Sequence, residues 1–314
     1  MIRSDVTDAA RLLLSIFVSD LLPVFAIAGV GFLLARLLKV QVQTMSRVTF
    51  YALAPALVFD MLVSSPVDAS QVGRMVLFYA LVTASAALMA RLAAGALKLD
   101  RPSLSAFLLV VISSNSGNYG LPVASLAFGR EALAFASVYF LTSSLFSYTG
   151  GILIAASGRR TLGDAVRGVL RVPAVYGAAA AGLALAFHVP MPDALLRPVQ
   201  MLSNAALPMM ILVLGMQLER ATRPDRPVTV ATAVALSIIA MPLAAIGIAR
   251  LVGLHGPAFQ AGVLQASMPT AVITTILALE FDVAPNFVTS VVVFSTLLSP
   301  VTVTLLIAFL QRYA

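Results

Sequence analysis

The chain has no cysteine and unusually little charge. Because no Cys occurs among its 314 residues, disulfide frameworks, thiolate nucleophiles, haem attachment and cysteine metal sites are excluded. Charged residues make up only 11% of the chain and hydrophobic residues 60%, with a mean hydropathy of +1.00. These values lie well outside the range of soluble domains. The sequence therefore predicts a chain embedded in lipid, with no soluble domain of any size.

Histidine and acidic residues are also scarce. His188 and His255 stand at predicted span ends without partners at metal-ligand spacing, so we expect no metal site and no cofactor. An intramembrane hydrolase would need paired Asp residues or a Ser-His set at mid-membrane, and none is apparent. The net charge of +7 comes from basic residues scattered through short loops, which argues against nucleic-acid binding. We therefore expect neither an enzyme nor a nucleic-acid-binding protein.

Apolar runs long enough to cross a ~30 Å hydrocarbon core as helices recur from one end of the chain to the other. We expect ten spans, separated by short polar or turn-forming segments. Their residues are 12–38, 46–64, 71–97, 104–128, 132–156, 172–189, 198–218, 228–253, 257–280 and 286–310. The first residues lack the cleavage signature of a secretory signal, so we expect the N-terminus to be retained.

The longest connection divides the chain into two halves. We expect a first five-helix repeat at 1–158, a connecting loop at 159–171 and a second five-helix repeat at 172–314. Of the 20 Lys and Arg residues, 13 fall on the side of the membrane that holds this loop. The positive-inside rule then places the loop in the cytoplasm and both termini on the extracytoplasmic side. We expect the membrane to be the cell (inner) membrane.

Proline positions repeat between the two halves. Pro55 and Pro122, in the second and fourth spans, have counterparts at similar separation in Pro208 and Pro269, in the seventh and ninth spans. Such internal repetition is typical of transporters. Because each half holds an odd number of spans, the two halves would cross the membrane in opposite senses. The sequence thus predicts an all-α membrane protein built as an inverted repeat.

The fourth and ninth spans are interrupted. Residues 113–122 include two glycines, two asparagines and a proline, and residues 265–270 carry a milder interruption. These residue types have poor helix propensity or lack a backbone donor. Backbone groups freed at membrane depth are tolerated only where protein or a watery cavity satisfies them. We expect both helices to break there, with Pro122 and Pro269 in the first turns of the second half-helices.

Paired broken helices at corresponding positions of two repeats point to a transporter binding site. The N-terminus of a half-helix exposes unsatisfied amide donors and a partial positive charge, which favours an anion. The alternative is that these residues only kink packed helices. The candidate substrate-binding residues are Asn115, Gly117, Asn118, Gly120, Pro122, Ser267, Pro269 and Thr270.

Four short motifs in a fixed order carry a family resemblance. They are Leu22-Pro23-Val24-Phe25, Asn115-Ser116-Gly117 with Gly120-Leu121-Pro122, Ala206-Leu207-Pro208 with Leu214-Gly215, and Met268-Pro269-Thr270-Ala271-Val272. In this order and spacing the chain resembles the auxin efflux carrier family, whose bacterial members include organic acid permeases and whose plant members are the PIN auxin exporters. The resemblance implies a ten-helix inverted repeat with a scaffold of spans one, two, six and seven and a mobile transport domain. It also implies an elevator-type motion around a crossing of spans four and nine.

Two departures from the family pattern bear on the substrate. Ile273 stands where many relatives carry Asn after the ninth-span motif. Ser143 or Ser144 aligns where some relatives carry Asn in the fifth span. We add both serines to the candidate substrate-binding residues, and the identity of the substrate stays open.

Acidic and small residues within the spans have structural interpretations. Asp20 and Asp60 fall near membrane ends, and we interpret them as solvated interfacial carboxylates rather than proton or sodium sites. Gly177 and Gly182 in the Ala-rich sixth span indicate close packing within the chain. If the protein forms a homodimer, we expect the scaffold helices to make it.

The predicted function is secondary transport of a small organic anion such as a carboxylate, as an exporter or a proton-coupled permease. The expected partners are that anion and the lipid bilayer. A sodium-coupled symporter of the bile-acid symporter type is an alternative, because its ten-helix fold also crosses two broken helices. A passive channel or a membrane receptor is a further alternative.

Overall fold

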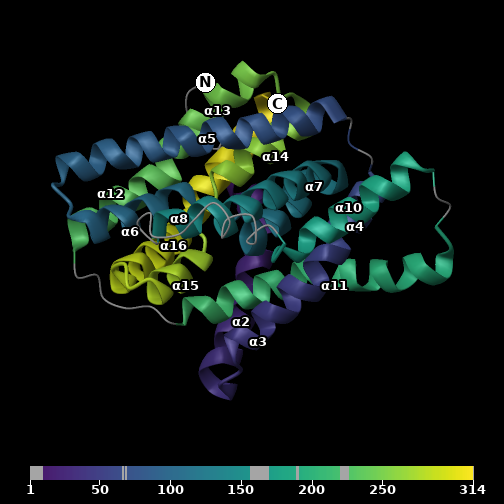
Figure 1. Ribbon diagram of the computed structural model, residues 1–314, viewed down its shortest axis with the longest axis horizontal. Helices are drawn as coiled ribbons and strands as arrows, with labels where there is room; N and C mark the ends of the chain where they lie inside the picture. Colours follow the sequence, from purple (N-terminus) through teal and green to yellow (C-terminus); the bar gives the residue numbers. More distant parts are fainter. Residues whose placement is uncertain are drawn as a thin grey trace.

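The computed structural model describes residues 10–65, 67, 69–155, 170–188, 191–219 and 226–313, and its regular elements within these ranges are all helices (Figure 1). Seven helices in these ranges are long and apolar enough to cross a membrane, and two shorter apolar helices cover Arg101–Ile112 and Pro173–Ala186. The chain is therefore a multi-pass helical membrane protein, as the composition predicts. The predicted connecting loop at 159–171 lies outside the described residues except for positions 170 and 171.

The elements follow one another with short connections, and η marks a π-helical turn. In chain order they are η1 (Phe17–Leu21), α2 (Leu22–Leu38), α3 (Val42–Val48), η2 (Thr49–Leu53), α4 (Ala54–Ser64), α5 (Ala69–Ala96), α6 (Arg101–Ile112), η3 (Ser116–Gly120), α7 (Leu121–Phe146), η4 (Ser147–Gly151), α8 (Ile152–Ala155), α10 (Pro173–Ala186), α11 (Asp193–Leu218), α12 (Pro227–Ala235), η5 (Leu236–Ala240), α13 (Met241–Val252), α14 (Gly256–Ala266), α15 (Ile273–Glu280) and α16 (Pro285–Tyr313).

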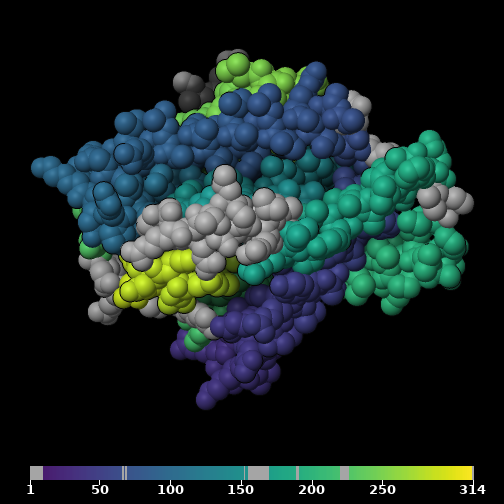
Figure 2. Space-filling model, viewed as in Figure 1, coloured from purple at the N-terminus to yellow at the C-terminus, as the bar shows by residue number. Residues whose placement is uncertain are grey.

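Helices α2, α4, α10 and α11 form one packed group, which we call the four-helix group. Helix α11 packs against α2 and α4, and α4 packs against α10. In the space-filling view, α10 and α11 project to the right and α2 lies below the main body (Figure 2). These helices coincide with spans one, two, six and seven of the sequence analysis.

Glycines bring the backbones of the four-helix group into direct contact. A side chain on Gly215 of α11 would collide with the backbone of Ala28 in α2, and one on Gly31 would collide with the backbone of Leu212. Gly177 of α10 is pressed in the same way against Pro55 of α4. The prediction that the sixth span packs within the chain is confirmed for Gly177, whereas a Cβ added at Gly182 would meet no other atom within 4 Å.

The other long helices form a second group, which we call the crossing group. Helix α14 packs against α7 and α13, α5 packs against α6, α7 and α13, and α16 packs against α12 and α15. Helix α5 runs across the upper part of the view in Figure 1, and α13 projects above it. At the start of α6, the Asp100 carboxylate caps the helix by accepting a hydrogen bond from the Ser103 N–H at 3.3 Å. Hydrogen bonding to Ser103 holds the pKa of Asp100 below its usual value.

The boundary expected between the fourth and fifth spans is a sharp kink rather than a loop. Helix α7 continues from Leu121 to Phe146, and only Gly129 leaves the helical conformation, with φ 77° and ψ −166°. A residue without Cβ adopts this positive φ without steric cost, so one residue is enough to turn the chain.

Asp20 and Asp60 are buried, so their interpretation as solvated interfacial carboxylates was wrong. Their side chains are 8% and 4% exposed. The Asp60 carboxylate accepts hydrogen bonds from the Ser203 hydroxyl at 2.8 Å and the Ser64 hydroxyl at 3.1 Å. The Ser19 hydroxyl donates to Asp20 at 2.7 Å. Ser203 lies on α11, 143 positions away from Asp60, so this partner is supplied by helix packing and not by local sequence.

Candidate functional site

The first helix break lies just before the glycines of the fourth span. Helix α6 ends at Ile112, and Ser113 adopts an extended conformation with φ −103° and ψ 94°. The helical path resumes with η3 at Ser116, so Gly117 lies in a π-helical turn after the break. Pro122 occupies the first turn of α7, as predicted. The interruption is therefore present, but its position is shifted toward the serines.

The second break covers more residues than the sequence suggests. Helix α14 ends at Ala266 and α15 begins at Ile273, so positions 267–272 lie outside both helices. Pro269 lies within this segment and not in the first turn of α15, which corrects that prediction. The carbonyl of Pro269 instead accepts a hydrogen bond from the other broken helix.

The two breaks cross and hydrogen-bond to each other. The Asn115 N–H donates to the Pro269 carbonyl at 2.7 Å, and the Ala271 N–H donates to the Ser113 carbonyl at 2.8 Å. These bonds form an isolated antiparallel bridge between Ser114 and Thr270. Each break thereby satisfies backbone groups that the other leaves free, as a membrane interior requires. We refer to this pairing as the crossing.

Thr270 anchors the crossing on both sides. Its hydroxyl donates to the Val110 carbonyl at the end of α6 at 2.9 Å, and its N–H donates to the Ser295 hydroxyl of α16 at 3.2 Å. The side chain of Thr270 is 1% exposed. Thr270 therefore connects three separate helical segments.

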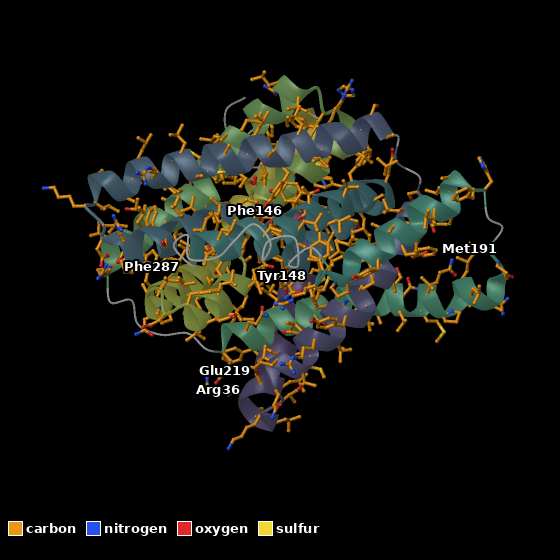
Figure 3. The ribbon with its side chains drawn as sticks, in the orientation of Figure 1. Arg36, Phe146, Tyr148, Met191, Glu219 and Phe287 are labelled. Atoms are coloured by element: carbon orange, nitrogen blue, oxygen red, sulfur yellow. The ribbon has the colours of Figure 1, made fainter. Side chains whose placement is uncertain are left out.

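A cavity of about 710 Å³ lies next to the crossing. Its walls are residues of the two breaks, of α7 and η4, of α3, η2 and α11, and of α15 and α16. Tyr148 of η4 lies near the middle of the molecule in Figure 3, and its ring stands 5.5 Å from that of Phe50 in η2. The cavity thus lies between the four-helix group and the crossing group.

Half of the predicted substrate-binding residues line this cavity. They are Asn115, Gly117, Asn118, Ser143 and Ser144. The Ser143 hydroxyl also hydrogen-bonds with the Ser116 hydroxyl at 2.7 Å, which ties α7 to η3. Asn115 is 5% exposed, and its Nδ2 is buried without a hydrogen-bond partner. A ligand acceptor in the cavity would satisfy this donor.

The other five predicted residues lie behind the cavity wall. The Ser267 hydroxyl donates to the Val263 carbonyl in the last turn of α14 at 2.6 Å. Gly120 packs directly on the Gln265 side chain. Pro122, Pro269 and Thr270 belong to the helix start and the crossing described above. In this structure these five residues shape the crossing instead of facing the cavity.

Two candidate functional residues, Gln265 and Gln217, were missed by the sequence analysis. Gln265 is fully buried; its amide donates to the Ala136 carbonyl at 3.3 Å, and its Oε1 has no partner. Gln217 of α11 lines the cavity, and its Oε1 is also buried without a partner. The signal for Gln265 was its place inside the interrupted ninth span, whereas nothing local marked Gln217.

The electrostatics of the cavity favour an anion. Asn115 to Asn118 and Ala271 to Ile273 line it, and these segments lead into the helical stretches that begin with η3 and α15. Their N-terminal ends carry partial positive charge. Among the described lining residues, Arg47 and Arg171 are cationic and Glu280 is anionic. All three are exposed, so they lie toward the mouth of the cavity.

Two broken helices that cross beside a cavity are an arrangement typical of membrane transporters. The comparisons agree: a family model described as "Membrane transport protein" matches residues 16–165 and 159–307. The chain belongs to this family, and the resemblance to auxin efflux carriers is confirmed.

Three relatives illustrate the range of the family. The chain is 30% identical over 271 residues to an uncharacterized transporter of Methanothermobacter thermautotrophicus, covering 84% of this chain and 87% of that protein. It is 28% identical over 120 residues to auxin efflux carrier component 6 of Arabidopsis thaliana, covering 37% of this chain and 21% of that protein. It is 33% identical over 147 residues to component 4 of the same plant, covering 43% and 23%.

Proposed function

We propose that this protein is a secondary active transporter for a small organic anion such as a carboxylate. The observation that carries the proposal is the cavity whose wall contains the N-terminal ends of two half-helices. Those ends, together with the buried Nδ2 of Asn115, offer donors and partial positive charge, and the two arginines among the described lining residues are both exposed. The plant relatives carry auxin efflux in their names, so auxin-like acids belong in the first substrate panel.

The proposed architecture is ten spans in two inverted five-helix repeats, at 1–158 and 172–314, joined by the loop at 159–171. Its support is that each expected span overlaps one helix or one pair of half-helices. The scaffold would be the four-helix group, which is fastened by backbone contacts at Gly31, Gly177 and Gly215. The crossing group would be the mobile transport domain of an elevator.

The proposed orientation places both termini outside the inner membrane. Arg47 and Arg171, at the cavity mouth, lie on the side that the positive-inside rule assigns to the cytoplasm. On this assignment the structure is an inward-facing state, with the cavity open to the cytoplasm. Export of the anion, or proton-coupled permeation, would follow from closure of this mouth and opening on the other side.

A homodimer through the scaffold is a further proposal. Leu195 and Met201 of α11 are 63% and 74% exposed, so an apolar surface is available on the four-helix group. Lipid covers such a surface in a monomer. Mass measurement of the protein in nanodiscs distinguishes the two states directly.

The first experiment identifies the ligand and then tests the site. A thermal-shift screen of mono- and dicarboxylates, sugars and amino acids on purified protein selects the compound that stabilises it most, because a ligand that binds only the folded state raises its stability. Counterflow of that radiolabelled compound is then measured in proteoliposomes. We expect a carboxylate, and we expect Asn115→Ala to slow its counterflow by about tenfold, the effect of losing one hydrogen bond to a charged ligand.

Asn204→Ala is the matched control for this substitution. Asn204 is an exposed residue of α11 outside the cavity, so the same chemical change there leaves counterflow at the wild-type rate. Unaltered counterflow in Asn115→Ala removes that residue from the site. Transport of sugars with no carboxylate transported refutes the anion proposal. Flux well above the turnover of a carrier favours a channel.

A further inference from the structure

Gln217 lines the large cavity from the side of the four-helix group. It lies in the last turn of α11, two residues after Gly215, whose backbone packs against that of Ala28 in α2. Close packing of two backbones gives this part of α11 a defined position. The described residues of α11 that line the cavity are Met210 and Gln217, about two turns apart on one face of the helix. Gln217 is the polar one of the two.

The side-chain oxygen of Gln217 is buried and accepts no hydrogen bond. In the described part of the chain, the other buried side-chain atoms without a partner are Asn115 Nδ2 and Gln265 Oε1, and Gln265 does not line the cavity. A buried acceptor without a partner costs free energy, because it has lost the hydrogen bonds that water would give it. The last side-chain torsion of glutamine is soft, so this oxygen can turn to a donor inside the cavity.

The two unpartnered atoms of the cavity wall are complementary. Asn115 Nδ2 is a donor and Gln217 Oε1 is an acceptor. The backbone of Asn115 is occupied on both sides, since its N–H donates to the Pro269 carbonyl and its carbonyl accepts from the Gly120 N–H at 2.9 Å. Its side chain is therefore the part left for a ligand. Helix α11 packs against η3, which begins directly after Asn115, so the two walls that carry these atoms adjoin.

An acceptor is a poor partner for a simple carboxylate. Both oxygens of an ionised carboxylate are acceptors, and neither can satisfy Gln217 Oε1. A site whose polar atoms are matched to a ligand hydroxyl or N–H rejects the analogue that lacks this group, because the atom of the site is then left unpaired. The wall of this cavity is matched to an anion that carries a donor of its own.

We propose that Gln217 is a specificity-determining residue, whose Oε1 accepts a hydrogen bond from a hydroxyl or N–H group of the transported anion. The inference rests on the proposed function, in which Asn115 Nδ2 donates to the carboxylate of the same molecule. The preferred substrate is then a carboxylate with a separate hydrogen-bond donor. The bound anion connects the crossing group, through Asn115, to the four-helix group, through Gln217.

Matched pairs of acids test the donor directly. The pairs are glycolate and acetate, 3-hydroxybutyrate and butyrate, and 4-hydroxyphenylacetate and phenylacetate, in which the hydroxyl stands progressively farther from the carboxylate. Calorimetric titration of the purified wild-type protein gives the dissociation constant of each acid. In at least one pair we expect the hydroxylated acid to bind about fivefold more tightly than its partner, the ratio for one neutral hydrogen bond. Absence of a hydroxyl preference in all three pairs overturns the proposal.

Variants assign the preference to Gln217. Gln217→Met keeps the length of the side chain and removes its amide, so we expect the hydroxyl preference to disappear while the acid without a hydroxyl binds at least as well as before. Gln200→Met is the matched control, because Gln200 is exposed on the same helix outside the cavity, and it should keep the preference. A preference that persists in Gln217→Met overturns the assignment. Equal weakening of both acids also overturns it, because Gln217 would then contact the carboxylate.

Transport separates this inference from the proposed function. Counterflow of the same radiolabelled acids is measured in proteoliposomes, and we expect the hydroxylated acid to have the lower half-saturating concentration in the wild type and not in Gln217→Met. Counterflow of carboxylates without any hydroxyl preference overturns the role of Gln217 and leaves the transporter proposal standing. Binding that depends on the hydroxyl and on Gln217, without counterflow of any acid, refutes the transporter proposal and leaves the assignment of Gln217 standing.

Discussion

The four-helix group and the crossing group differ in how their helices pack and satisfy polar groups inside the membrane. In the four-helix group, continuous helices touch backbone to backbone at Gly31 and Gly215, and its buried Asp60 is satisfied by two serines. In the crossing group two helices are broken, and their backbones are satisfied by each other at Asn115 and Ala271. The first arrangement resists deformation. The second leaves buried polar atoms, such as Asn115 Nδ2, available to a ligand.

The largest loss of folded protein is expected when a side chain is added where the backbones of α2 and α11 touch. Gly215→Val would drive its side chain into the backbone of Ala28, which cannot move away as a flexible side chain can. Overpacking costs about 1–3 kcal/mol where the neighbours can shift and more where they cannot. We expect little folded protein by size-exclusion chromatography in detergent. Gly182→Val, where nothing lies within 4 Å, should express like the wild type; equal yields of the two variants would contradict the close contact.

A smaller loss of stability is expected from a substitution at the crossing. Thr270→Val keeps the shape of the side chain but removes the hydrogen bond to the Val110 carbonyl, which lies at the end of α6. Interhelical hydrogen bonds in membrane proteins contribute up to about 1–2 kcal/mol. Unfolding in graded sodium dodecyl sulfate measures the loss. Thr289→Val on α16 is the control, because that hydroxyl bonds only within its own helix; a similar loss in both variants would contradict an anchoring role for Thr270.

The buried carboxylate of the four-helix group gives the next prediction. Ser203→Ala removes a hydroxyl that bridges α11 to Asp60, whereas Ser64→Ala removes one that comes from the same helix as Asp60. We expect Ser203→Ala to cost about 1 kcal/mol in the same unfolding assay and Ser64→Ala to cost less. The reverse order would mean that the interhelical bond is not the one that holds Asp60.

The smallest change is expected at Gln265. Gln265→Met removes both the weak bond to the Ala136 carbonyl and the unpartnered Oε1, while it keeps the length of the side chain. Removing a poorly satisfied polar group from a buried site is close to neutral, so we expect a change in unfolding free energy below about 1 kcal/mol. A much larger loss would show that Oε1 has a partner, such as a buried water.

Sequence reasoning located the broken helices but not the residues that hold them together. Glycine, asparagine and proline in residues 113–122 predict a weak helix. The break lies at the serines, where Asn115 hydrogen-bonds to Pro269. Ser295, which accepts from the Thr270 N–H, belongs to another helix and has no local signature. Asp60 was misjudged for the same reason, since its partner Ser203 is brought near only by helix packing.

Alternating access to the cavity is the claim that one labelling experiment tests most directly. Because the chain has no Cys, single cysteines can be placed at Asn118 in the cavity and at Arg47 at its mouth without background labelling. A membrane-impermeant thiol reagent is then applied to inside-out and right-side-out vesicles. The account predicts that Asn118→Cys reacts in both preparations and Arg47→Cys only in inside-out vesicles. Reaction of Asn118→Cys from the cytoplasmic side alone would contradict it.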